Sequence, residues 1–158
     1  GNHIHISRNA FDEQAQARLV LIYARFESII KILSRRGNKT EYCEDVLDSV
    51  SRVCVEFSDI IVKRQKEKRK NTAINFNNSE TIEFRVFRGT MNTNVLIANI
   101  QLVQLIADLS LQELSIQDIL DLTFTKLVNK MIEADYKELI QCLALIKITK
   151  SPYLFTGC

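Results

Sequence analysis

Residues 81–90, with the sequence TIEFRVFRGT, constrain the fold most because their apolar and polar side chains alternate. The alternation assigns the side chains to two faces, Ile82, Phe84 and Val86 on one and Glu83, Arg85 and Phe87 on the other. A period of two in β-branched and aromatic residues predicts a half-buried strand at residues 81–88. Glu83 and Arg85 would lie on one face, about 7 Å apart by strand rise. Together they form either a surface ion pair or a metal ligand beside a phosphate or carboxylate clamp.

Two further strands are predicted. At residues 3–7, His3, His5 and Ser7 alternate with two isoleucines. Two histidines at positions i and i+2 of a strand can point at one metal ion or phosphate group, although a solvent-facing or vector-derived pair has the same pattern. Residues 73–76 form a short strand before the polar turn at 77–80, so they should pair with 81–88 as a hairpin.

The rest of the chain is predicted to be helical, because its 158 residues include one proline and four glycines. Apolar residues at spacings of three and four place helices at about 12–36, 44–68, 95–109, 115–133 and 136–148. The helix at 95–109 is apolar almost all round and should be buried. Asn92 and the pair Ser115 and Asp118 are the expected N-terminal caps. We expect a single α+β domain over residues 1–158, a small antiparallel sheet with about five helices packed on one side.

Charge and cysteine content narrow the function. The net charge of +2 does not favour a nucleic-acid partner. The basic run at 63–70 is interpreted as a solvated helix end, with a phosphate-attracting rim as the alternative. The four cysteines (Cys43, Cys54, Cys142 and Cys158) form no CxxC pair, which argues against a zinc site and for reduced thiols in the cytosol. With no signal peptide and no apolar run long enough to cross a bilayer, we predict a cytoplasmic protein without a membrane partner.

Two separated motifs carry a resemblance to a known family. NHIHIS at residues 2–7 and IEFRVFRGT at 82–90, with a long helical insert between them, resemble the carboxylate–amine ligases of the glutamine synthetase superfamily. They are most similar to the amidoligase branch, which is common in phage and mobile-element neighbourhoods. In that family an H-x-H-x-S strand and a later E-x-R strand line the ATP and metal site. The resemblance covers residues 1–109.

The resemblance implies a set of site residues: His3 and Glu83 as ligands of Mg²⁺, His5 and Ser7 as contacts of ATP, and Arg85 with Arg88 as contacts of phosphate or carboxylate. It also implies a two-step reaction. ATP phosphorylates a carboxylate, and an amine then displaces the acyl phosphate to give an amide. The substrates would bear carboxylate and amine groups, with peptides and cell-wall compounds among the candidates. Metal ions and an arginine clamp suit the charge that builds on a transferred phosphoryl group.

The family also draws metal-binding carboxylates from strands that precede the H-x-H strand. One Glu and one His are a poor site for Mg²⁺, which prefers an octahedral shell of oxygen ligands. We therefore expect the chain to be the C-terminal part of a larger glutamine-synthetase-like catalytic domain, inactive without its N-terminal part. The alternative is a non-catalytic helical binding or structural module of a phage or mobile element, in which the motif strands serve only packing.

Overall fold

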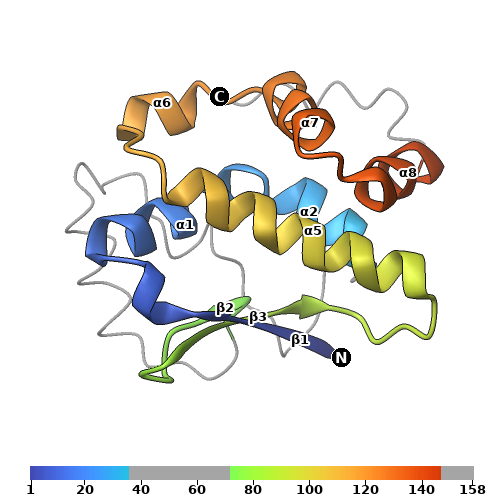
Figure 1. The fold of residues 1–158 in the computed structure, drawn as a ribbon, viewed down its shortest axis with the longest axis horizontal. Coiled ribbons are helices and arrows are strands. Elements are labelled where there is room, and N and C mark those ends of the chain that lie inside the picture. Colours follow the sequence, from blue (N-terminus) through green and yellow to red (C-terminus); the bar gives the residue numbers. More distant parts are fainter. Residues whose placement is uncertain (36–71, 147–158) are drawn as a thin grey trace.

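The structure of the protein is a computed structural model that describes residues 1–35 and 72–146 (Figure 1). Its strands are β1 (Asn2–Ser7), β2 (Ile74–Asn75) and β3 (Thr81–Phe87). A short 3₁₀ helix, η1 (Arg8–Ala10), follows β1. The α-helices are α1 (Glu13–Arg25), α2 (Glu27–Leu33), α5 (Thr93–Ser110), α6 (Ile116–Leu120), α7 (Phe124–Glu133) and α8 (Lys137–Leu145). The predicted α+β class is confirmed.

The described strands form one antiparallel sheet in the order β1-β3-β2. The hairpin of β2 and β3 is confirmed, with Ile74 opposite Phe84. Its turn is held by asparagine side chains, since Asn78 Oδ1 accepts from the Glu80 amide at 2.7 Å. β1 pairs with the other edge of β3, with Ile4 opposite Phe84. The two motif strands therefore share a sheet, although more than seventy residues separate them in the chain.

β3 departs from the predicted alternation at its end. Asn2 pairs with Phe87 whereas Ile4 pairs with Phe84, so β3 has one residue more than β1 between these pairs. Such a bulge re-aims the side chains that follow it. Phe87 consequently lies on the same face as Phe84, and it is 1% exposed. The prediction that Phe87 shares a face with Glu83 and Arg85 is therefore wrong.

All described helices lie on one side of the sheet, as expected (Figure 1). α5 runs over the sheet and contacts α1 on one side and α8 on another, while α6, α7 and α8 form a further layer. The sheet contributes the fully buried side chains of Ile74, Ile82 and Phe84 to the core. This arrangement leaves the opposite face of the sheet without a helix from the described residues.

Two predicted helices are each divided in two. The helix predicted at 12–36 breaks at Phe26, whose amide bonds to both Ile22 O and Tyr23 O in a tightened turn. The apolar stripe continues across the break, and Phe26 is buried, so no propensity signal marks it. The helix predicted at 115–133 is divided into α6 and α7, because Thr123 caps a new helix by accepting from the Lys126 amide. The capping box of Ser115 and Asp118 is confirmed.

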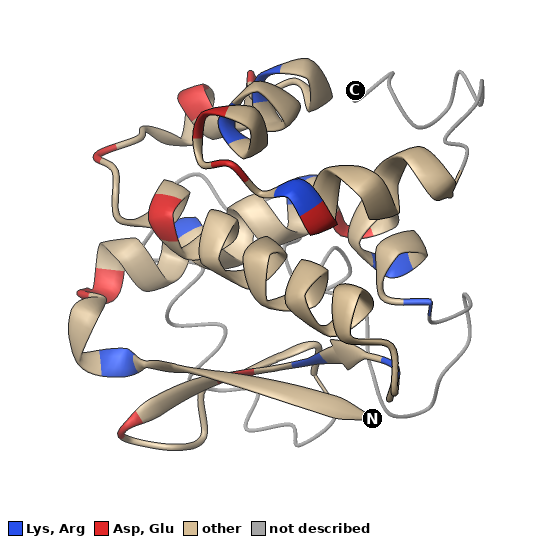
Figure 2. Cartoon of the chain, turned by 45° about the vertical axis from the view of Figure 1, so that its right-hand side comes forward, with Lys and Arg blue, Asp and Glu red and all other residues tan. Residues whose placement is uncertain are grey.

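α5 carries few charged residues, as the tan colour along most of its length shows (Figure 2). Asn92 caps it as predicted, accepting from the Val95 amide at 3.2 Å. Its 18 residues are long and apolar enough to cross a membrane, so the prediction that the chain holds no such run is wrong by length and composition. However, 56% of the helix is buried inside the protein, as in a core helix of a soluble fold.

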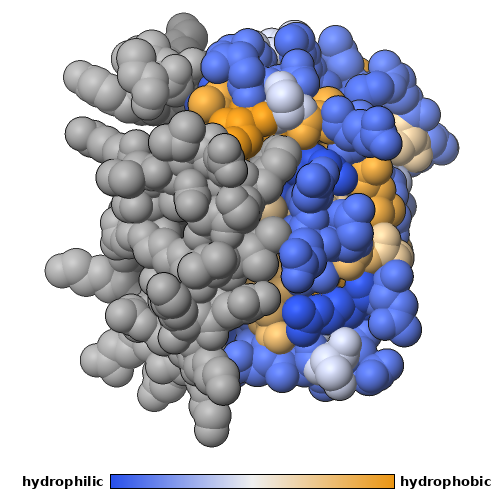
Figure 3. All heavy atoms as spheres, turned by 90° about the vertical axis from the view of Figure 1, so that its left-hand side faces the viewer, coloured by the Kyte–Doolittle hydropathy of each residue, from blue (hydrophilic) through white to orange (hydrophobic). Residues whose placement is uncertain are grey.

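Several predictions fall outside the described residues. They concern the helix at 44–68, the basic run at 63–70 and the cysteines Cys43, Cys54 and Cys158. Cys142, on α8, is a free thiol. On the side drawn in Figure 3, hydrophilic residues cover most of the described surface, with smaller hydrophobic areas between them. Scattered exposed hydrophobic residues of this kind are normal on protein surfaces.

Candidate functional site on the polar face of the sheet

The face of the sheet opposite the described helices carries the polar side chains of both motifs. His3, His5 and Ser7 are exposed along β1, while Ile4 and Ile6 between them pack against the hydrophobic core. Glu83 and Arg85 of β3 are half-buried. The alternation predicted for these five polar positions is therefore correct up to the bulge in β3.

The Glu83 carboxylate is the centre of this group. Its Oε1 lies 2.7 Å from His3 Nδ1, 3.8 Å from His5 Nε2 and 3.7 Å from Arg85 Nε. Its Oε2 accepts a hydrogen bond from Asn75 Nδ2 at 3.0 Å. One carboxylate thus contacts side chains from all three strands, and its side chain keeps 16% exposure to solvent.

Strand register explains this convergence. His5 and Asn75 both stand directly opposite Glu83, one on each neighbouring strand. Opposite residues of an antiparallel pair point to the same face, with Cβ atoms about 5 Å apart. His3 lies two residues along β1, on the same face, beside the bulge of β3. Between the pairs Ile4–Phe84 and Asn2–Phe87, His3 faces two residues of β3, Arg85 and Val86, instead of one.

This group of side chains can bind an anion through its arginine and histidines, and it can offer the Glu83 carboxylate to a cation. The Arg85 guanidinium offers a planar fork to phosphate or carboxylate oxygens, and the two imidazoles offer further N–H donors. Among the described residues of this group, Glu83 is the one that carries a negative charge. In residues 1–35 and 72–146, no group of three or more His, Cys, Asp or Glu side chains is arranged to hold a metal ion. These residues alone could supply some of the ligands of an octahedral Mg²⁺ site, but not all of them.

Three kinds of comparison were made with known proteins. No protein-family model, curated protein or solved structure matches the chain. The site therefore has to be interpreted from its own residues and their contacts.

The structure brings together most of the residues that the sequence singled out. The prediction that His3 and Glu83 are close in space is confirmed by their contact at 2.7 Å. His5 and Arg85 join the same group. Ser7 stands opposite Thr81 at the far end of β1, next to the pair of His5 and Glu83. The catalytic, nucleotide and metal roles of these residues stay predictions.

Arg88 is not part of this group. It follows β3, it is exposed, and its amide bonds to Ser34 O at 3.1 Å. Among the described residues, no hydrogen bond or ion pair joins the Arg88 side chain to Glu83 or the histidines. The bulge ends the alternation before Arg88, so its position could not be extrapolated from Arg85.

The sequence did not point to three residues that support this group of polar side chains. Asn75 binds the Glu83 carboxylate, and Thr81 Oγ1 lies 3.3 Å from His5 Nδ1. Arg8 supports the hairpin turn, since its Nη1 donates to Phe76 O and Asn78 O at 3.0 Å each. The alternation in residues 73–76 could have placed Asn75 on a face. Its position opposite Glu83 needed the hairpin register, which the turn composition does not fix.

Proposed function

We propose that this chain contributes the phosphate- and metal-facing sheet of a cytoplasmic, ATP- and Mg²⁺-dependent carboxylate–amine ligase of the glutamine-synthetase-like kind. The observation that carries the proposal is the 2.7 Å contact of His3 with Glu83, which joins the H-x-H-x-S and E-x-R motifs in one sheet. If the two short motifs occurred together by chance, their polar side chains would not be expected to meet on one face of the sheet. The resemblance described above supplies the reaction class.

Each residue then has a task that its chemistry suits. Arg85 holds the transferred phosphate or the substrate carboxylate with its planar fork, and Glu83 beside it keeps the guanidinium oriented at 3.7 Å. His5 and Ser7 lie toward the far end of β1 and contact the nucleotide. The substrates are a carboxylate and an amine, which the acyl phosphate joins as an amide.

Mg²⁺ would neutralise the charge that develops on the phosphate oxygens when it is bound. His3 and Glu83 would be part of its ligand shell, and Glu83 would have to exchange its contact with His3 for the ion. The remaining oxygen ligands must come from outside the described residues, because one carboxylate and two imidazoles do not complete an octahedron. The described residues by themselves should therefore bind Mg²⁺–ATP weakly.

The two histidines provide a direct test, because the chain contains two in all and both lie on this face. Mn²⁺, a paramagnetic substitute for Mg²⁺, should broaden both imidazole Cε1–H signals in an NMR titration. Adding ATP should strengthen the broadening, because phosphate oxygens add ligands to the ion. Circular dichroism of each variant checks that the fold is kept.

A matched pair of variants makes this test specific. Glu83→Gln should remove the broadening, whereas Glu80→Gln should keep it, because Glu80 is exposed in the hairpin turn and bonds to Ser79. If both variants respond like the wild type, the histidines bind Mn²⁺ without Glu83 and the proposed site is wrong. A lack of any ATP effect in a folded chain would favour the non-catalytic binding module.

A further inference from the structure

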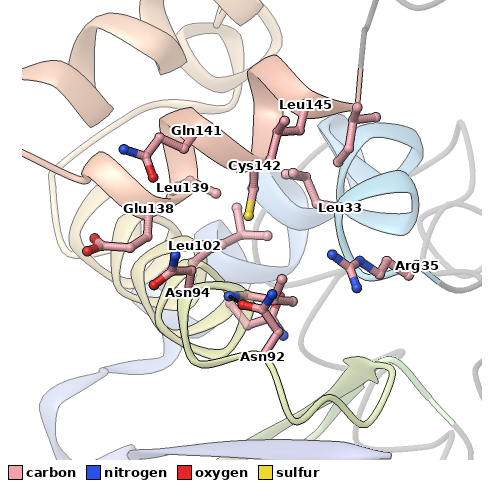
Figure 4. Close-up of a pocket in the computed structure, with 14 residues that line it drawn as sticks. Leu33, Arg35, Asn92, Asn94, Leu102, Glu138, Leu139, Gln141, Cys142 and Leu145 are labelled. Carbon is pink, nitrogen blue, oxygen red and sulfur yellow. Dashed lines mark hydrogen bonds between the residues drawn. The ribbon is translucent and has the colours of Figure 1, made fainter.

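A pocket of about 270 Å³ lies between the end of α2, the first half of α5 and α8 (Figure 4). None of its lining residues belongs to a strand, so it is separate from the polar face of the sheet. Apolar side chains form much of its wall: Leu33, Val95, Ala98, Leu102, Leu139, Leu145 and Ile146. Such a wall favours an apolar ligand group, and the polar residues of the lining decide what else the ligand must carry.

Polar groups gather in the same pocket. The Arg35 guanidinium and the Cys142 thiol point toward one space, above Asn92 (Figure 4). Asn92 uses its side-chain oxygen to cap α5, so its amide nitrogen remains as a donor. Within residues 1–35 and 72–146, the Arg35 side chain makes no hydrogen bond or ion pair. A cation without a carboxylate partner beside an apolar wall is suited to an anionic head group.

Asn99 gives an independent sign of a ligand. It lines the pocket and is only 4% exposed, yet in the described part of the chain its side-chain amide makes no hydrogen bond. A buried amide normally has a hydrogen-bond partner, and a ligand in the pocket would supply one. Val95, Ala98 and Leu102 surround it on the same face of α5. Asn99 therefore presents a polar group to the pocket at a position where an apolar residue would fit the helix pattern.

The acidic residue of the lining does not oppose an anion here. The Glu138 carboxylate points away from the pocket (Figure 4), and its Oε2 accepts from Gln101 Nε2 at 2.6 Å. Gln101 Oε1 in turn accepts from the Leu139 amide at 2.9 Å. The acid is thus held at the outer side of α5 and α8, while Arg35 supplies the charge that faces inward.

We propose that this pocket binds a small monocarboxylate with an unbranched apolar tail, its carboxylate between Arg35 and the amides of Asn92 and Asn99. At about 30 Å³ for each water-sized group, the volume admits roughly nine such groups. Hexanoate, with six carbons and two oxygens, is of this size. The tail lies along Leu102 and Leu139, next to the Cys142 sulfur. A ligand bound in this pocket stiffens the contact between α5 and α8. The proposal of this binding site does not depend on the ligase proposal.

Cys142 serves as the reporter of occupancy. Alkylation of the folded full chain by iodoacetamide is followed at each cysteine separately by peptide mass spectrometry. At hexanoate ten times its Kd about a tenth of the chains stay free, so Cys142 should react roughly tenfold more slowly. The rates at the other cysteines should not change. 1-Hexanol, which has the tail without the charge, should protect Cys142 only weakly.

Variants separate the charge from the cavity. Arg35→Asn suits the left-handed backbone at this position (φ 57°) and should weaken hexanoate protection without changing that of 1-hexanol. Asn99→Leu should fill the pocket and remove protection by both compounds. Lys137→Gln, at an exposed pair with Asp135 outside the lining, is the matched control and should behave like the wild type.

Three results would overturn the proposal. They are protection of Cys142 by 1-hexanol as strong as that by hexanoate, unchanged hexanoate protection in folded Arg35→Asn, and no protection by either compound. None of these results bears on the Mn²⁺ titration, because the pocket and the sheet face share no residue. The two proposals can therefore fail independently.

Discussion

Replacing Arg18 by methionine should destabilise the protein by about 2–3 kcal/mol. Arg18 lies on α1, is 6% exposed, and donates from Nε to the Ser110 carbonyl at the end of α5, at 2.8 Å. Methionine keeps an apolar stem of similar length but removes the donor and the charge. A hydrogen bond to a charged group contributes about 1.5–3 kcal/mol, and a cation at a helix C-terminus adds about 0.3–1 kcal/mol. Water cannot readily replace the donor, since Ser110 is fully buried.

Urea denaturation followed by circular dichroism measures this loss, and a thermal scan should show a decrease in Tm of about 4–12 °C for a chain of this size. Arg25→Met is the matched control on the same helix. Arg25 Nε has no hydrogen-bond partner among the described residues, and the guanidinium lies over the Phe26 ring, so the loss on Arg25→Met should stay below about 1 kcal/mol. Equal losses for both variants would show that the Ser110 bond does not hold α1 to α5.

Three further outcomes are expected. If the proposed ligase activity is present, Arg85→Lys should abolish its ATP turnover with an unchanged circular dichroism spectrum, because lysine lacks the planar fork. Turnover within a few fold of wild type would make Arg85 only an ion-pair partner. Asn92→Ala should cost about 1 kcal/mol in urea denaturation by removing the cap of α5. Burial raises the pKa of the Cys142 thiol and that of the Tyr136 hydroxyl above their usual values, and Asp108 adds to the rise at Tyr136. Because the folded state keeps these protons longer, stability should fall as the pH rises through the alkaline range, and less steeply in Tyr136→Phe.

The sequence was a good guide where local pattern decides the structure. Alternation placed His3, His5, Glu83 and Arg85 on polar faces, and the family resemblance placed their strands together. Capping side chains located the starts of α5 and α6. Apart from the pairing of the two motif strands, these features depend on a few neighbouring residues, so the information for them lies within a short stretch of chain.

Features that depend on distant partners were missed. The bulge that buries Phe87 follows from how β1 packs against β3. No local feature of the sequence predicts this bulge. The break at Phe26 lies inside an unbroken apolar stripe, because buried apolar residues such as Ile22 and Ile30 lie on both sides of it. The pocket around Asn99 needs α2, α5 and α8 together. Packing between elements decided each of these, and periodicity reports only one element at a time.

The pairing of β1 with β3 also bears on how the chain is made. Residues 2–7 leave a ribosome before their partner at residues 81–87, which follows about 80 residues later. At about 5–20 residues per second the first strand waits roughly 4–16 s with an unpaired edge. Strands left open in this way are prone to wrong pairing, and contacts so far apart in sequence slow folding. Translation speed and chaperone binding in this interval should therefore govern how much of the chain reaches the folded state.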